Sequence, residues 1–106
     1  MVDYSRLQKD LKDIYGDKTV LLKRSGRFYV LYYYNNIGKA REIAYLLNLM
    51  VFRLNMVEPI SINNPDICGF PYPSLERYRK TIEKDWKIVI YDNGRIDYPE
   101  CKTKLN

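Results

Sequence analysis

The sequence predicts one small α+β domain, in which a mixed β-sheet of about five to six strands is flanked by three helices. The 106 residues suffice for one hydrophobic core and are too few for two, so residues 1–106 are treated as a single domain. Apolar residues make up 46% of the chain and recur at helical spacing in three segments. Short runs typical of strands lie between these segments, and no repeat or linker interrupts them.

The first third of the chain indicates a helix followed by a hairpin. Residues 3–15 carry apolar side chains at helical spacing, with Asp3 as the expected N-cap and Gly16 as the expected stop. The apolar face of this helix consists of Tyr4, Leu7, Leu11, Ile14 and Tyr15. Residues 19–24 and 27–34 are rich in β-formers, and the Ser-Gly pair between them suits a turn.

The middle of the chain indicates a second helix and a strand. Asn36 is expected to cap the helix. The apolar stripe of this helix comprises Ile37, Ala40, Ile43, Ala44 and Leu47. Residues 50–57 alternate so that one face is apolar and the other carries a cation, which predicts a half-exposed strand. A loop rich in Pro and Asn follows at 58–66, and then a segment at 67–74 that glycine and proline hold in a tight conformation.

The last third predicts a helix and a second hairpin. In residues 74–85 the apolar positions share one face of a helix. Residues 87–98 form a hairpin pattern around Asn93-Gly94, a pair that suits a type I′ turn because both positions need positive φ. The hairpin's second strand and the tail occupy residues 94–106, and the tail at 99–106 is only weakly determined.

Several classes of function are disfavoured by what the sequence lacks. Histidine is absent, which removes the commonest general base and metal ligand, and no phosphate-binding GxxxxGK[ST] or GxGxxG motif occurs. We therefore expect no enzyme, no catalytic residue, no metal and no cofactor. Cys68 and Cys101 are read as reduced thiols, and no apolar run reaches the roughly 18 residues of a membrane span, so we expect a cytoplasmic protein without membrane contact.

Positive charge is concentrated around the aromatic strand. The net charge is +5, and between residues 18 and 57 Glu42 is the sole acid. The cations of that stretch are Lys18, Lys23, Arg24, Arg27, Lys39, Arg41 and Arg53. This pattern suits a polyanionic partner and equally suits an ordinary solvated face.

The strand at 27–34 is aromatic on both faces. Side chains two residues apart share a face, so Phe28 and Val30 point one way with Tyr32 and Tyr34. Tyr29, Leu31 and Tyr33 point the other way. One face is expected to pack against the helices, and the second must be covered or must meet a partner. The pattern leaves open whether all the rings are packing residues or some form a surface for stacking.

A collinear series of motifs carries a family likeness. The stretches "LLKRSG", "GRFYVLYYYNNIGKAREIAYLLNL", "EPI" and "CGFPYPSLERYRKTIEKDWKIVIYDN" together resemble the N-terminal mismatch-recognition domain of the MutS family, over about residues 4 to 93. The resemblance implies a mixed sheet with helices and contact with duplex DNA from the minor-groove side. In that family an aromatic residue wedges beside the mispaired base, and a glutamate two residues later hydrogen-bonds it. Phe28 matches the wedge, and Val30 stands where the glutamate would be.

The resemblance also assigns the remaining site residues. Arg27 stands where the family has an aspartate before the wedge, Arg24 belongs to the basic rim, and Arg53 matches a basic position that implies a contact with the DNA backbone. Gly69, Phe70 and Pro71 match a family loop that approaches the minor groove. Because valine cannot hydrogen-bond a base edge, we expect weak or no mismatch selectivity.

Three functions follow from these observations. The leading one is a stand-alone DNA-binding module that lacks the family's ATPase and clamp domains. The alternative is a protein-interaction adaptor, in which the aromatic strand and the "CGFPYP" segment form a docking patch. An enzyme that holds a divalent ion between Asp92 and Asp97 ranks last, because these residues read more simply as solvated acids beside a turn.

Overall fold

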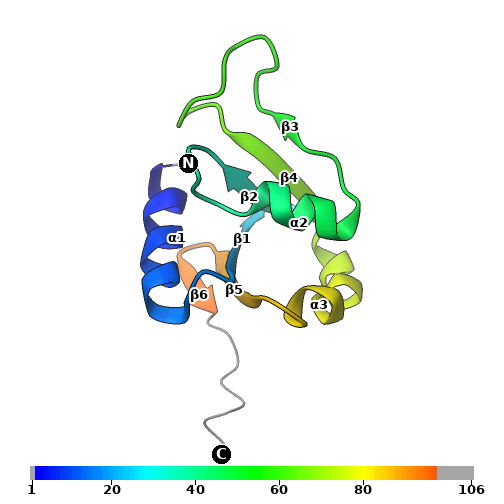
Figure 1. Ribbon diagram of the computed structural model, residues 1–106. Helices are drawn as coiled ribbons and strands as arrows, with labels where there is room; N and C mark the ends of the chain where they lie inside the picture. Colours follow the sequence, from blue (N-terminus) through cyan, green and yellow to red (C-terminus); the bar gives the residue numbers. More distant parts are fainter. Residues whose placement is uncertain (1, 98–106) are drawn as a thin grey trace, which may run out of the picture.

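The computed structural model describes residues 2–97 and confirms a small α+β fold with a six-stranded mixed sheet (Figure 1). The elements, in chain order, are α1 (Val2–Tyr15), β1 (Thr19–Ser25), β2 (Phe28–Tyr33), α2 (Ala40–Leu47), β3 (Phe52–Arg53), β4 (Asp66–Pro71), the 3-10 helix η1 (Tyr72–Ser74), α3 (Leu75–Glu83), β5 (Lys87–Asp92) and β6 (Arg95–Asp97). The strands lie in the order β3-β4-β2-β1-β5-β6. β1 pairs in parallel with β5, and the other neighbouring strands pair antiparallel.

The main hydrophobic core lies between the sheet and helices α2 and α3. Alternate residues of β2, namely Tyr29, Leu31 and Tyr33, point into this core and meet the buried stripe of α2. Its buried members are Val20, Leu22, Tyr29, Leu31, Ala40, Ile43, Ala44, Cys68, Phe70, Leu75, Ile82 and Ile88. The aromatic strand therefore uses one of its two faces as core, as expected.

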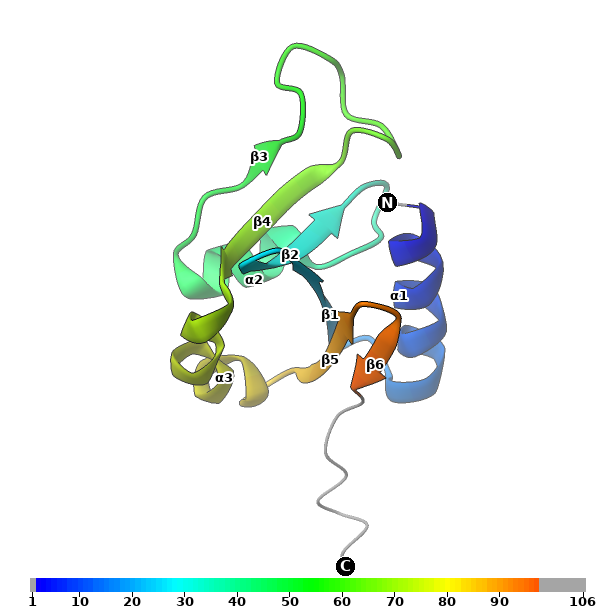
Figure 2. The same ribbon diagram turned by 180° about the vertical axis from the view of Figure 1, so that it is seen from behind.

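Helix α1 packs on the opposite face of the sheet. Tyr4 and Leu11 of α1 lie over Leu21 of β1 and Val89 of β5, and the Tyr4 ring meets Tyr32 edge to face with 4.9 Å between centroids. Figure 2 shows α1 beside β1, β5 and β6, with no helix over β2 and β4 on this face. Consequently one half of this sheet face is covered by α1 and the other half lies open.

The starts of two helices differ from the prediction. α1 begins at Val2, so Asp3 lies in its first turn and is not the cap. α2 begins at Ala40, because Asn35 and Asn36 adopt φ of 53° and 64° and the chain turns there, outside helical geometry. Gly38 is required in this turn, since a Cβ there would lie 1.9 Å from the Tyr32 carbonyl oxygen.

The segment 50–71 shows the largest departures from the prediction. The predicted strand at 50–57 is reduced to Phe52–Arg53, and the apolar face proposed for it is exposed to solvent. In contrast, Asp66–Pro71 is a six-residue strand in the interior of the sheet where a tight segment was expected. Among the described residues no helix covers the segment 50–57, so its apolar side chains stay exposed to solvent.

Of two further predictions, one is confirmed and one is wrong. The hairpin at 87–97 is confirmed, with Asn93 and Gly94 at φ of 49° and 82°. Ile14 was expected on the packed face of the first helix, but its side chain is 68% exposed. Cys101 and the tail at 98–106 lie outside the described residues. Across the described range, no helix combines the length and the apolar character needed to cross a lipid bilayer.

Candidate functional site

The open half of the sheet gathers four of the residues that the sequence analysis singled out. Phe28 pairs with Pro71 and Val30 pairs with Gly69 across β2 and β4, so these four positions share one face. Lys23 of β1 is the other neighbour of Val30 and joins the same face. We call these five residues the open face.

Phe28 is the most prominent member of the open face. It opens β2, pairs with Ser25 on one side, and its ring is 50% exposed, so the helices do not enclose it. The turn before it is tight, and Gly26 with φ of 60° suits the first position of a type II′ turn. The ring therefore stands at the end of a rigid hairpin, where a flat group can reach it.

Gly69 keeps the centre of the open face flat. An added Cβ would lie 3.0 Å from the carbonyl oxygen of Tyr29, closer than side chains normally approach. Val30 therefore has only backbone opposite it on β4. Glycine at an interior strand position commonly marks a place where another group approaches the backbone.

Two arginines lie at the same end of the sheet as Phe28. Arg27 occupies the turn, its side chain is exposed, and its carbonyl oxygen accepts a 2.8 Å hydrogen bond from the backbone N–H of Tyr72. Arg24 lies on the other face, where its guanidinium stacks 3.9 Å from the centre of the Tyr72 ring and donates to the Gly26 carbonyl oxygen at 2.6 Å. Its Nη1 is 3.9 Å from Asp92, which offsets one positive charge, and Arg27 keeps the charge around the hairpin tip net positive.

The side chain of Phe70 does not join this surface, which corrects its assignment. Its ring is 1% exposed and makes edge-to-face contacts with Tyr29 and Tyr78, at 6.0 and 5.1 Å between centroids. The alternation of β4 sends Phe70 into the main core and its neighbours Gly69 and Pro71 to the open face. Residues 68–71 are thus part of a strand, not a loop.

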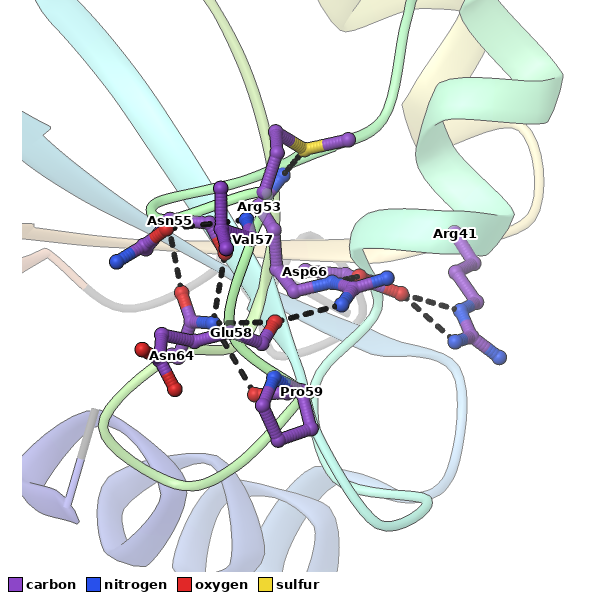
Figure 3. A network of polar contacts seen from close by, with 9 residues as sticks. Arg41, Arg53, Asn55, Val57, Glu58, Pro59, Asn64 and Asp66 are labelled. Carbon is purple, nitrogen blue, oxygen red and sulfur yellow. Dashed lines mark hydrogen bonds and ion pairs between the residues drawn. The ribbon is translucent and has the colours of Figure 1, made fainter.

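Arg53 is also placed away from the open face. It pairs with Asp66, the first residue of β4, whereas Phe28 pairs with the last, and it lies on the face that packs against α2. Figure 3 shows its guanidinium between Asp66 and the 54–65 loop, with Nε 3.6 Å from the carboxylate and Nη1 donating to the Glu58 carbonyl oxygen at 3.0 Å. The guanidinium is therefore engaged in internal contacts that hold the loop, and the DNA-backbone contact of Arg53 stays a prediction.

Lys23 is the open-face residue that the sequence analysis counted among the cations but did not select as a site residue. Its position follows from the hairpin register, in which a two-residue turn at Gly26–Arg27 pairs Lys23 with Val30. Within residues 2–97 no ion pair or hydrogen bond is recorded for its ammonium group. Counting back from the Ser-Gly turn would have found this residue.

A second exposed surface was also missed by the sequence reasoning. The segment 50–57 presents apolar side chains to solvent: Met50, Val51, Phe52, Leu54, Met56 and Val57, with Val57 93% exposed. The loop is held firmly, because the Asn64 side chain accepts from the Asn55 backbone N–H at 2.8 Å and donates to the Asn55 and Pro59 carbonyl oxygens (Figure 3). Contiguous exposed apolar surface of this kind is typical of interaction sites.

Metal-ligand groups and the thiol of Cys68 were considered in the sequence analysis, and the structure places both. No group of three His, Cys, Asp or Glu side chains in residues 2–97 is arranged to hold a metal ion. Cys68 is fully buried, and burial raises the pKa of its thiol to about 11, so the group is a neutral packing residue at ordinary pH.

No protein-family model matches the chain, and no curated protein matches it. The likeness to the MutS domain therefore stays a prediction.

Proposed function

We propose that the open face binds DNA, with Phe28 as the stacking group and Lys23 and Arg27 as phosphate contacts. The observation that carries the proposal is the half-exposed Phe28 ring at the hairpin tip, beside cations and without a helix over it. Aromatic stacking is worth about 1 to 3 kcal/mol per base and tolerates any base, because every base has a π-face. The partner that suits this arrangement is duplex DNA met from the minor-groove side, where an apolar wedge partly unstacks a base step.

The proposed binding discriminates mismatches weakly or not at all. Val30 lies next to Phe28 on the same face and offers no hydrogen-bond donor or acceptor to a base edge. Lys23 beside it is a point charge that suits phosphate better than a directional base contact. As part of this proposal the protein works in the cytoplasm, a compartment that keeps thiols such as Cys68 reduced.

The test is a fluorescence titration of matched, mispaired and single-stranded oligonucleotides with the full chain. Phe28→Ala should lose about 1 to 3 kcal/mol of binding free energy without unfolding. The matched control is Tyr45→Ala, because Tyr45 is an exposed aromatic residue on α2, which packs on the other face of the sheet. Equal binding by wild type and the Phe28 variant would remove this ring from the site.

Salt dependence supplies an independent readout of the phosphate contacts. With two or three cations engaged, affinity should fall about 10- to 100-fold between about 50 and about 200 mM salt. Lys23→Gln should weaken binding to all sequences alike and should flatten that salt dependence. A salt-independent affinity would contradict the proposal.

The exposed segment 50–57 favours a second candidate, a protein-interaction adaptor. Its methionine and aliphatic side chains suit an apolar protein partner, and the Asn64 side chain holds the backbone of the loop that presents them. This candidate differs from the docking patch expected from the aromatic strand, since it uses edge strand β3 and the residues around it, whereas β2 lies in the interior of the sheet. Binding of a protein that is lost on Met56→Asp, survives Phe28→Ala and barely responds to salt would favour this candidate over DNA binding.

We propose binding and not catalysis for this chain. Asp92, the acid considered for a metal, has Arg24 3.9 Å from its carboxylate, and that cation disfavours a divalent ion beside it. Magnesium-dependent nuclease activity that vanishes on Asp92→Ala would overturn this part of the proposal.

A further inference from the structure

A second exposed phenylalanine lies on the face of the sheet that carries Phe28. Phe52 of β3 pairs with Ile67 of β4, and Ile67 pairs with Tyr32 of β2, so these three side chains share one face. Phe28, four residues before Tyr32 in β2, points to the same side, on which the Tyr32 ring also meets Tyr4 of α1. Phe52 is 48% exposed, close to the 50% of Phe28. One side of the sheet therefore presents two half-exposed rings.

The strand register gives the separation of these two residues. On one side of β4, Phe28 pairs with Pro71. On the other side, Phe52 pairs with Ile67, four residues earlier in β4. At about 3.3 Å per residue along a strand and about 4.8 Å between strands, the Cα atoms of the two phenylalanines are about 16 Å apart. Gly69 lies halfway along this diagonal, about 8 Å from each of them.

The middle of the diagonal is bare backbone. Gly69 has no side chain, and a Cβ there would lie only 3.0 Å from the Tyr29 carbonyl oxygen. Figure 2 shows β2, β4 and β3 side by side with no helix over them on this face. The cations Lys23 and Arg27 lie near the Phe28 end. This arrangement suits an anionic ligand that carries flat groups at intervals.

A regular duplex cannot use both rings from its minor groove. Base pairs rise by about 3.4 Å each, so about 16 Å corresponds to about five base pairs, which is half a helical turn. Over half a turn the minor groove rotates to the far side of the duplex. Successive bases of an extended single strand lie up to about twice that rise apart, so three nucleotides nearly span the distance from Phe28 to Phe52.

We propose that the open face also binds single-stranded DNA, in a site that extends from Phe28 to Phe52. One base stacks on each ring, and the nucleotide between them lies over Gly69. The phosphates near Phe28 meet Lys23 and Arg27. This site rests on the proposed function and adds Phe52 as a stacking residue, which a duplex bound at the hairpin tip does not use.

The test compares an oligothymidine of about eight nucleotides with a hairpin duplex of about twelve base pairs, each titrated with the full chain. Phe52→Ala should weaken oligothymidine binding about 5- to 150-fold, as expected for the loss of one stacked base, and should leave duplex binding unchanged. Phe52→Trp keeps a flat ring and should bind oligothymidine at least as well as wild type. The matched control is Val57→Ala, because Val57 is 93% exposed in the same apolar segment and has no ring.

Failure of this site and failure of the proposed function give different results. If wild type binds neither DNA, both are wrong. If duplex binding requires Phe28 while Phe52→Ala leaves oligothymidine binding unchanged, the proposed function stands and the extended site is wrong. An equal loss in Phe52→Ala and Val57→Ala would show that the strand adheres to apolar surface without stacking, and would overturn the site. A loss in Phe52→Trp as large as that in Phe52→Ala would overturn it too, because the ring would then have a structural role.

Discussion

Two halves of one sheet face carry similar residues in opposite environments. Under α1, Leu21 and Val89 are fully buried and Tyr32 packs against Tyr4. Two residues along β2, Val30 is partly exposed, and Phe28 beyond it is 50% exposed. The strand's composition does not change along this path, so the helix above it decides which rings are core. An aromatic strand in a sequence therefore predicts burial only together with the element that covers it.

The largest expected effect is a loss of folding stability from a substitution in α1, the helix that covers the buried half of this sheet face. Leu11 is 1% exposed, and Leu11→Ala should lower the free energy of unfolding by about 2 to 5 kcal/mol because it leaves a cavity against β1. Ile14→Ala is the matched control on the same helix. Since Ile14 is 68% exposed, its replacement should change stability by no more than about 0.5 kcal/mol, as measured by urea denaturation.

A large loss of stability in the Ile14 variant would change how much of this sheet face is assigned to the half that α1 covers. If Ile14→Ala destabilises the protein as much as Leu11→Ala does, then Ile14 packs in solution and α1 covers more of the sheet than the structure shows. The DNA-binding surface would then be correspondingly smaller.

The sequence was sufficient for features that local chemistry decides. The first strand pair, the third helix and the Asn93-Gly94 hairpin follow from periodicity and turn residues, and each is confirmed. The turn of the first pair lies at Gly26–Arg27, one residue beyond the predicted Ser-Gly pair, because Ser25 still pairs with Phe28. The two-face division of β2 also followed, because alternation holds wherever a strand forms. These features gave the fold class and the shared face of Phe28 and Val30.

Features that depend on distant packing could not be predicted in this way. Glycine and two prolines in residues 67–74 indicated a tight segment, yet Asp66–Pro71 pairs with two strands at once because β2 and β3 lie beside it. Arg53 looked like a free cation in the sequence, but the fold brings Asp66 to within 3.6 Å of it. Charge counts along a chain cannot show which cations are already paired.

The next effect in size concerns pH and the main core. Burial raises the Cys68 pKa from an ordinary value of 9.0 to about 11, so the folded state keeps the proton that the unfolded chain releases. The stabilising contribution is complete below about pH 9 and is lost as pH rises toward about 11, with a slope of at most about 1.4 kcal/mol per pH unit. Burial raises the pKa of Tyr4 as well, and this adds a further loss above about pH 10.

Cys68→Ala isolates the thiol in that profile. Urea denaturation under reducing conditions, from about pH 8 to about pH 10, should show a smaller loss of stability with pH in the variant than in wild type. Cys68 lies in the main core and is not part of the open face, so DNA binding should not follow the same profile. Parallel stability curves for the two proteins would mean that Cys68 is not buried in solution.

The smallest effect tests whether the open face presents position 30 to a base. Val30→Glu places a carboxylate beside Lys23 and opposite Gly69, where the flat backbone leaves room and the cation offsets the new charge, so stability should change little. One added hydrogen bond is worth about 0.5 to 1.5 kcal/mol, which would appear as preference for a mispaired over a matched duplex. Overall affinity should fall slightly, because the carboxylate repels phosphates.

Val30→Gln keeps the hydrogen-bonding group without the charge and separates these two effects. Absence of any mismatch preference in both variants, with Phe28 still required for binding, would mean that the DNA contacts the hairpin tip and does not reach the middle of the open face.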